Sequence, residues 1–263
     1  MSNVLVSEGP VTLITLNRPE VRNALNSETI KELLALLKTI ASNPHIDVVI
    51  LTGAGEKAFC AGADLAEVQQ LKSLNAVRGY FGQMAELVQA LQQLPQPVIG
   101  AVFGYTLAGG MGIAAAVDLL LAADDTRFGL PEMKVGLYPM VVTAPIVRLI
   151  GARRTLELGL TGRVIDAATA QAWGFINQVV SKSDLMAEAE NLASEICQGS
   201  PIIARLGKEG WRLSQNMTMD EAMDTLKNMV SLVALSEDSR EGVSAFLEKR
   251  APKWPSQIGQ PGH

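Results

Sequence analysis

The sequence predicts an α/β fold followed by a C-terminal layer of helices. Short apolar runs typical of buried strands recur along the first two thirds of the chain, and glycine-rich turns follow two of them. In the last third, amphipathic stretches follow one another with no strand between them. We expect one main domain with two regions, a core at residues 1–195 and a helical region at residues 196–263.

The first part of the chain predicts a hairpin and a helix. Residues 4–16 alternate apolar and polar side chains around Gly9 and Pro10, which is typical of two strands joined by a tight turn. A helix follows, with apolar side chains on one face and either Asn26 or Ser27 as its N-terminal cap.

Two further buried strands each lead to a glycine turn. Residues 48–52 form one strand, and Gly62 follows it before a mostly helical stretch at 65–94 with a polar interruption at 72–78. The other strand ends near Val102, and Ala108, Gly109 and Gly110 then open a helix that runs to about Val117.

The rest of the chain continues this alternation and then becomes helical. We expect a buried strand at 119–123, an extended piece at 127–129, a turn at Pro131 and Glu132, helices at 145–159 and 167–173, and a last strand at 174–180. Three amphipathic helices follow, at 186–196, 201–215 and 219–235, and residues after Pro252 are expected to be disordered.

The two glycine turns are candidate anion sites. Amides at a helix start lack intrahelical partners, and a turn without side chains lets a ligand oxygen reach them. If Ala63 and Gly109 both point their amides at one spot, they form a two-donor pocket for an oxygen that becomes negative during a reaction. The alternative is that Gly109 and Gly110 only allow the helix to pack closely on its neighbour.

Four segments together resemble the enoyl-CoA hydratase/isomerase, or crotonase, superfamily: AFCAGADL at 58–65, AGGMG at 108–112, PE at 131–132 and AFLEKR at 245–250. The resemblance covers nearly the whole chain. It implies a crotonase-like spiral of repeated ββα units and assembly as homotrimers or as hexamers made of two trimers. It also implies binding of acyl-CoA thioesters in an oxyanion hole made by the amides of Ala63 and Gly109.

The resemblance makes Glu132 the catalytic carboxylate. A glutamate beside an apolar wall has a raised pKa, which suits proton transfer near neutral pH, although exposed glutamates are commoner. Hydratases of this family carry a second glutamate at the position of Gly112. A single glutamate favours double-bond isomerisation, and hydration by Glu132 alone is the main alternative. Decarboxylation stays open, whereas Met140 stands where dehalogenating members have an aspartate.

The resemblance also implies residues that bind coenzyme A. We regard coenzyme A as part of the substrate and not as a separate cofactor. These residues are Arg22, Ala24 and Ala61 near the first glycine turn, and Phe246 and Lys249 in the tail, which often serve an adjacent subunit. Without the resemblance, Arg22 is a surface arginine and Lys249 a favourable charge at a helix end. A protein that binds acyl-CoA without turnover is the alternative from another class.

The helical stretch at 65–94 contains Tyr80, Phe81 and Met84, which either line the acyl tail or pack in the core. In this family the stretch borders the acyl pocket.

Composition and charge narrow the classes of function. A net charge of −5 disfavours a nucleic-acid-binding surface, and the chain contains no apolar run of about eighteen residues that could span a membrane. The first ten residues lack the features of a signal peptide, so we expect a cytoplasmic location. Cys60 and Cys197, with His45 and His263, match neither a zinc site nor a Cys-His nucleophile, and Cys60 is expected to be a buried core thiol.

Overall fold

The computed structural model describes residues 2–257; Met1 and residues 258–263, which include His263, lie outside the described part. Its strands are β1 Val4–Ser7, β2 Val11–Leu16, β3 Val48–Gly53, β4 Ala58–Cys60, β5 Val98–Val102, β6 Tyr105–Leu107, β7 Leu119–Ala123, β8 Arg127–Gly129, β9 Val164–Asp166 and β10 Gln178–Val180.

The α-helices are α1 Ser27–Ala41, α2 Leu65–Gln70, α3 Leu74–Gln93, α4 Gly109–Ala114, α5 Met140–Thr161, α6 Ala167–Ala172, α7 Leu185–Cys197, α8 Pro201–Ser214, α9 Met219–Ala234 and α10 Glu237–Leu247. Short 3₁₀ helices lie at η1 Pro19–Val21, η2 Pro131–Val135 and η3 Pro255–Gln257.

From β3 to β8, consecutive strands alternate between two sheets. The larger sheet has the order β1-β2-β3-β5-β7-β10, and the smaller has the order β4-β6-β8-β9. Three times in succession, a strand of the larger sheet (β3, β5 and β7) is followed by one of the smaller sheet (β4, β6 and β8) and then by helices. The chain therefore winds as a spiral of ββα turns.

Parallel pairing in the smaller sheet decides where the loops gather. β4 pairs with β6, and β6 with β8, in parallel, although the β4–β6 register shifts between Ala58 and Cys60. The carboxyl ends of parallel strands lie at the same edge of a sheet, where ligands commonly bind. The turns that follow β4, β6 and β8 are therefore brought together.

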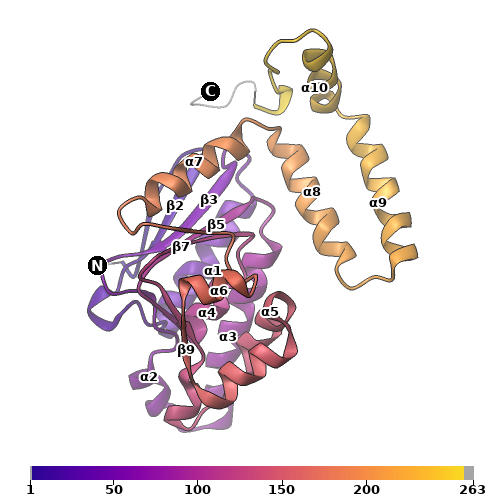
Figure 1. Ribbon diagram of the computed structural model, residues 1–263. Coiled ribbons are helices and arrows are strands. Elements are labelled where there is room, and N and C mark those ends of the chain that lie inside the picture. The colour runs from indigo at the N-terminus through magenta and orange to yellow at the C-terminus, as the bar shows by residue number, and fades with distance from the viewer. Residues whose placement is uncertain (1, 258–263) are drawn as a thin grey trace.

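Two apolar clusters lie on either side of the larger sheet. The bigger cluster joins that sheet to α1, α3, α4 and α5, and includes Ile30, Leu87 and Ile146. On the opposite face, Ile50 and Ile99 pack against Leu185 and other residues of α7. Figure 1 shows α7 lying across the sheet on the side away from α1 and α3.

The predicted hairpin and the cap of the first long helix are confirmed. β1 and β2 pair as antiparallel strands, and the Asn26 side chain accepts a hydrogen bond from the Thr29 N–H at the start of α1. The polar interruption expected at 72–78 is shorter than predicted, because the Ser73 side chain caps α3 and lets the helix begin at Leu74.

Other boundaries differ from the sequence prediction for local reasons. The helix expected at 145–159 begins at Met140 and bends at Gly151, whose φ of +79° is non-helical. The helix that starts at Gly109 ends at Ala114, before Val117. The short strands β4, β6 and β9 were not expected as strands, because three residues carry too little periodicity to predict one.

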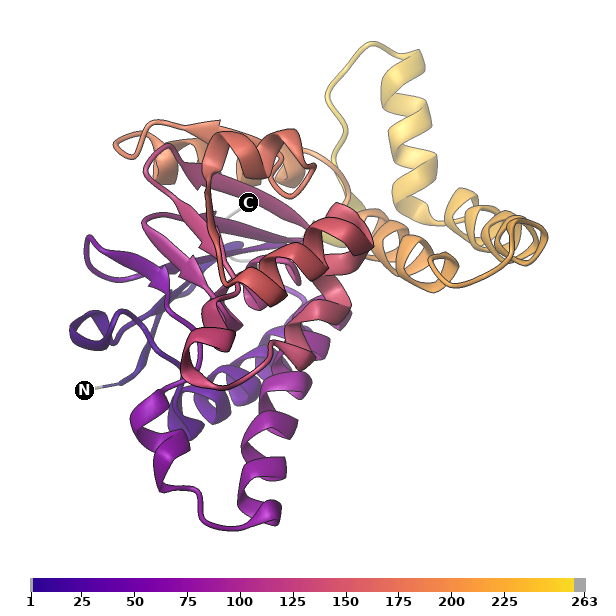
Figure 2. The same cartoon turned by 60° about the horizontal axis from the view of Figure 1, so that its bottom comes forward.

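Helices α8–α10 form an arm that projects from the spiral (Figures 1 and 2). The predicted run of helices without an intervening strand is confirmed for residues 186–257. At the base of the arm, Lys208 Nζ lies 2.6 Å from Asp118 Oδ2 in an ion pair with little solvent exposure. None of the described helices combines the length and apolar character needed to cross a membrane.

The expectation of disorder after Pro252 is wrong for residues 253–257. The Trp254 indole N–H donates to the Gln198 carbonyl at 2.9 Å, and the Ser256 N–H donates to Asp238 Oδ1 at 3.0 Å. The partners in these two hydrogen bonds are 56 and 18 residues apart in the sequence, so composition alone does not reveal them. The remainder of that expectation, residues 258–263, lies outside the described part.

Candidate active site

The turns after β4, β6 and β8 meet at the edge of the smaller sheet and surround one cavity of about 710 Å³. Ala63 comes from the first turn, Gly109 from the second and Glu132 from the third, and all three line the cavity. The structure therefore brings together the three residues that the sequence predicted as catalytic.

Ala63 is held by a short parallel bridge to Leu25. The Leu25 N–H donates to the Gly62 carbonyl at 2.8 Å, and the Asp64 N–H donates to the Leu25 carbonyl at 3.0 Å. Since alternate residues of an extended chain turn their backbone groups to opposite sides, the N–H of Ala63 faces away from Leu25. That amide is left free on the side of the cavity.

Tyr80 of α3 braces the same bridge. Its buried hydroxyl donates to the Leu25 carbonyl at 2.5 Å and accepts from the Asp64 N–H at 3.2 Å. The Asp64 side chain caps α2 and pairs with Arg18 at 3.0 Å. The backbone on both sides of the bridge is thus fixed by side chains.

Gly109 opens α4 after a strained turn. Ala108 has φ of +51° and ψ of −122°, a conformation that L-residues rarely adopt. A Cβ added to Gly62 would lie 2.9 Å from the Gly109 nitrogen, and a Cβ added to Gly109 would lie 3.6 Å from the Ala63 nitrogen. The two turns are therefore in backbone contact, which only glycine at residue 62 permits.

Among residues 2–257, no backbone acceptor takes the N–H of Ala63 or that of Gly109. Both N–H groups are close together and belong to residues that line the cavity. Paired free donors of this kind can hold an oxygen that gains negative charge.

Glu132 lies in η2, directly after β8. Its Oε2 is buried and has no hydrogen-bond partner within the described part of the chain. Burial raises the pKa of Glu132 to about 7, and a hydrogen bond from its own backbone N–H opposes the rise. The carboxyl group can therefore both accept and release a proton near neutral pH.

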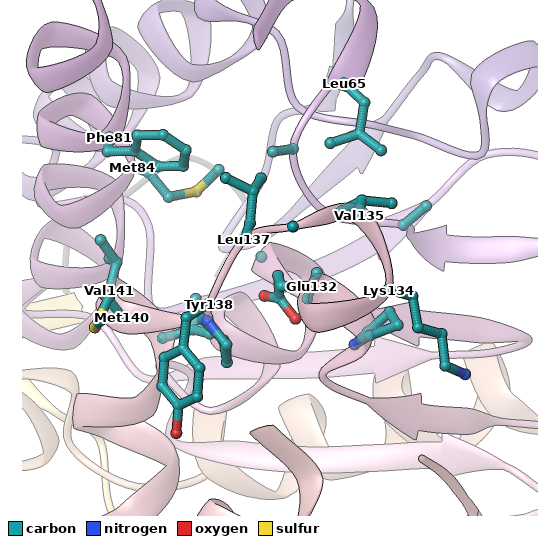
Figure 3. Close-up of a pocket in the computed structure, with 18 residues that line it drawn as sticks. Leu65, Phe81, Met84, Glu132, Lys134, Val135, Leu137, Tyr138, Met140 and Val141 are labelled. Carbon is teal, nitrogen blue, oxygen red and sulfur yellow. The ribbon is translucent and has the colours of Figure 1, made fainter. Parts of the chain in front are cut away.

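The cavity wall is otherwise mostly apolar (Figure 3). Besides Glu132, the lining side chains with a polar end are Lys134 and Tyr138. The apolar lining side chains include Leu65, Phe81, Met84, Val135, Leu137, Met140, Val141 and Val142. Phe81 and Met84 thus face the cavity, whereas Tyr80 serves the Leu25 bridge.

Gly112 has no room for a side chain. A Cβ at this position would lie 2.2 Å from Cγ1 and 2.7 Å from Cβ of Val142 on α5. Val142 is buried and lines the cavity. The place toward which a side chain at residue 112 would point is therefore filled by an apolar group.

Of the residues that the resemblance assigned to coenzyme A, only Ala61 lines the cavity. Arg22 is adjacent to Ala61, because its carbonyl accepts from the Ala61 N–H at 3.0 Å. The Ala24 carbonyl accepts from the Arg18 guanidinium at 2.6 Å. The Arg22 guanidinium carbon lies 5.5 Å from the centre of the Tyr105 ring.

Phe246 and Lys249 are not brought to the cavity of their own chain. Phe246 is 83% exposed on α10, in the projecting arm, and Lys249 follows the helix end with φ of +55°. Both residues therefore lie outside the cavity lining of their own chain, and their contact with coenzyme A stays a prediction.

Sequence reasoning missed the roles of two residues at the site. Tyr80 holds the Leu25 bridge in place, and Val142 fills the space beside Gly112. No sequence pattern links Tyr80 to Leu25, 55 residues away, or Val142 to Gly112.

Burial of Cys60 raises its pKa to about 12, so this thiol is unreactive, as expected for a core residue. Within residues 2–257, no three His, Cys, Asp or Glu side chains gather as a metal ion would require.

The fold and the site together define a class of protein: a ββα spiral in which two backbone amides and a buried carboxylate belong to residues that line one cavity. A family model described as enoyl-CoA hydratase/isomerase matches residues 7–257. A probable enoyl-CoA hydratase of Mycobacterium leprae is 38% identical, over 93% of this chain and 94% of the relative. A short-chain-enoyl-CoA hydratase of Clostridium acetobutylicum is 36% identical, over 94% and 95%.

Comparison with solved structures indicates the same family. An enoyl-CoA hydratase of Mycobacterium smegmatis superposes with a TM-score of 0.94 at 31% identity, covering 97% of this chain and 99% of that one. One from Bacillus anthracis has a TM-score of 0.92 at 36% identity, with the same coverage. The chain belongs to the enoyl-CoA hydratase/isomerase family. The family resemblance and the crotonase-like spiral expected from the motifs are confirmed.

Proposed function

We propose that the protein acts on acyl-CoA thioesters and moves a proton on the carbon chain next to the thioester. The amides of Ala63 and Gly109 hold the thioester oxygen as it becomes an enolate oxygen, and Glu132 transfers the proton. The observation that carries the proposal is that, within residues 2–257, the buried Oε2 of Glu132 has no hydrogen-bond partner and lies in the same cavity as two free amides. Family membership supports the substrate class.

The reaction we favour is a double-bond shift from the 3-enoyl to the 2-enoyl thioester. The Glu132 carboxylate removes a proton from C2, and the C2–H electron pair forms the enolate whose oxygen the two amides stabilise. As the enolate collapses, the double bond moves to C2–C3, and C4 takes the proton from Glu132. One carboxylate suffices, because it receives and returns the same proton.

The site offers no second carboxylate at the position of Gly112, and Val142 occupies that space. Hydration requires both activation of a water molecule and protonation of C2, a task that two carboxylates divide more easily than one. This difference supports isomerisation over hydration.

Hydration of 2-enoyl thioesters by Glu132 alone is the second candidate. It is favoured by the names of the relatives, since the matched Mycobacterium leprae and Clostridium acetobutylicum proteins are both called enoyl-CoA hydratases. In this case Glu132 takes a proton from water as the oxygen adds to C3, and then returns a proton to C2. The oxyanion hole serves both reactions in the same way.

We further propose that the arm mediates assembly into a homotrimer or a hexamer. Trp211, Met219, Leu232 and Phe246 on α8–α10 are all more than half exposed, which is unusual for large apolar side chains. In such an assembly, Phe246 and Lys249 would reach the coenzyme A bound to a neighbouring subunit. Sedimentation analysis tests the assembly: a monomer at micromolar concentration contradicts it.

The test of the reaction is a panel of trans-2-, cis-3- and trans-3-enoyl-CoA substrates with product analysis. We expect 3-enoyl substrates to yield 2-enoyl products faster than 2-enoyl substrates yield 3-hydroxyacyl products. The reverse order supports hydration. Tight binding without turnover or exchange of the C2 proton indicates an acyl-CoA-binding protein and contradicts both enzymatic candidates.

A further inference from the structure

One end of the cavity is an apolar compartment between α3 and α5. Phe81 and Met84 of α3 form one wall, and Val141 and Val142 at the start of α5 form the other; α3 and α5 are in contact. Figure 3 shows Phe81, Met84 and Val141 on one side of Glu132, with Leu137 between them and the carboxylate. We call these five residues, with Leu137 included, the acyl compartment.

The polar side chains of the cavity turn away from the acyl compartment. A Cβ added to Gly162 would lie 3.2 Å from Lys134 Cε, so this lysine leans toward the C-terminal end of α5. A Cβ added to Gly159 would lie 3.0 Å from the Tyr138 hydroxyl, which therefore packs against the same helix. In Figure 3, Lys134 and Val135 lie on the side of Glu132 opposite Phe81 and Met84.

A short acyl group would leave most of the cavity unfilled. At about 30 Å³ per heavy atom, the volume of a water molecule in the liquid, a four-carbon group occupies roughly 120 Å³. The cavity measures about 710 Å³. Even if about half of it holds the thioester and the adjoining part of coenzyme A, room remains for roughly ten carbons.

At the start of α5, next to Val141, the cavity lining includes a solvent-exposed side chain. Met140, which also lines the cavity, is 72% exposed at the start of α5. Because the Met140 side chain is mostly exposed, it does not seal the cavity at the start of α5.

Resting on the proposed function, we infer that the acyl group taken by this site is an unsubstituted hydrocarbon chain of medium length, about eight to ten carbons. Each methylene buried against Phe81, Met84, Val141 and Val142 adds affinity. A hydroxyl or carboxylate on the distal part of the chain would lose its water without gaining a partner, which opposes binding.

Binding of saturated acyl-CoA thioesters tests this inference without turnover. The series is butanoyl-, hexanoyl-, octanoyl- and decanoyl-CoA, measured by calorimetry on the full-length protein. A fully buried methylene contributes about fourfold, so octanoyl-CoA should bind at least tenfold more tightly than butanoyl-CoA even with partial burial. Glutaryl-CoA, which has five carbons and a terminal carboxylate, should bind at least tenfold more weakly than pentanoyl-CoA.

Two variants of α5 locate the chain. Val141→Trp fills the acyl compartment and should reduce the octanoyl advantage over butanoyl to less than threefold. Val147→Trp, on the same helix but outside the cavity lining, is the matched control and should keep the advantage. An unchanged advantage in a folded Val141→Trp protein would place the chain elsewhere and overturn the assignment.

The inference and the proposed function fail in different ways. Equal affinity for butanoyl- and octanoyl-CoA, or equal affinity for glutaryl- and pentanoyl-CoA, contradicts the inference whatever the enzyme catalyses. A clear chain-length preference without turnover of any enoyl-CoA supports the acyl compartment and contradicts the proposed reaction.

Discussion

A Cβ at residue 112 would lie 2.2 Å from Cγ1 of Val142, so α4 and α5 approach each other at a point where only glycine fits. Val142 is also part of the cavity wall beside Glu132. The absence of a carboxylate at residue 112 is therefore matched by an apolar side chain from the opposite helix. A carboxylate side chain at residue 112 therefore needs a change at Val142 as well.

We predict that Gly112→Glu alone destabilises the protein, because overpacking of a core contact costs about 1–3 kcal/mol. Val142→Ala would not relieve the contact, since the Val142 Cβ itself would lie 2.7 Å from the new Cβ. Gly112→Glu combined with Val142→Gly removes both of these close contacts and leaves the Val142 Cα at 3.6 Å, an ordinary contact distance. Chemical denaturation measures the difference between the single and double variants.

The double variant should also raise the ratio of hydration to isomerisation. The control is Val142→Gly alone, which opens the same space without adding an acid. If a well-folded double variant gains no hydratase activity over this control, the identity of residue 112 does not set the reaction.

The pKa of Glu132 predicts the pH dependence of catalysis. Proton abstraction needs the carboxylate, so kcat/KM should rise with pH and level off above a midpoint near pH 7. Initial rates between pH 5 and pH 9, with a substrate whose own ionisation does not change, give the midpoint. A profile that is flat down to pH 5 would show that the group removing the proton has an ordinary carboxylate pKa.

The raised pKa of Glu132 also makes the stability of the protein depend on pH. The folded protein holds the Glu132 proton more tightly than the unfolded chain, whose pKa is near 4.5. Stability contributed by this group is thus fully present below pH 4.5 and is lost as the pH rises through 7. Glu132→Gln should therefore lose less stability than the native protein between pH 5 and pH 8.

The Ala63 amide is predicted to stabilise the enolate. An ordinary side-chain mutation leaves this backbone N–H in place, so the test is an amide-to-ester substitution at Ala63 in a semisynthetic protein, which removes the N–H and keeps the backbone shape. Loss of one oxyanion donor should cost about 3 kcal/mol in the barrier, or roughly a hundredfold in rate. Unchanged exchange of the substrate C2 proton would show that this amide does not act on the enolate.

Tyr80 is predicted to position that amide through the Leu25 bridge. Tyr80→Phe keeps the ring but removes the hydroxyl that contacts the Leu25 carbonyl and the Asp64 N–H. We expect kcat to fall by about tenfold with KM changed by less than threefold, since loosening the donor affects the transition state more than substrate binding. Tyr105→Phe, at a half-exposed tyrosine outside the cavity lining, is the control. Equal effects of both changes would contradict a positioning role.

Much of the fold followed from local patterns. The strand at 48–52, the glycine turn at Gly62 and the cap at Asn26 depend on neighbouring residues, so periodicity and capping chemistry predict them. The three-residue strands β4 and β6 are defined by pairing with each other, which a single segment does not encode. The kink at Gly151 likewise depends on how α5 packs.

The residues of the site also fall into two groups, those that the sequence predicts and those that only the structure identifies. Glu132, Ala63 and Gly109 lie in motifs that resemble a known family, and their convergence follows from parallel strands ending at one edge. Tyr80 and Val142 act across long sequence separations and lie in ordinary apolar helix patterns, so only the structure identifies them. Phe246 and Lys249 lie on the arm, away from the cavity of their own chain.

Glu132 is proposed to move the proton, and Glu132→Gln tests this role most directly. Glutamine has nearly the same size but cannot act as the base. We predict that exchange of the C2 proton of a bound acyl-CoA with solvent deuterium, followed by NMR, slows by at least about a hundredfold, while acyl-CoA affinity changes by less than about threefold. Exchange at a near-native rate in this variant would contradict the assignment of Glu132.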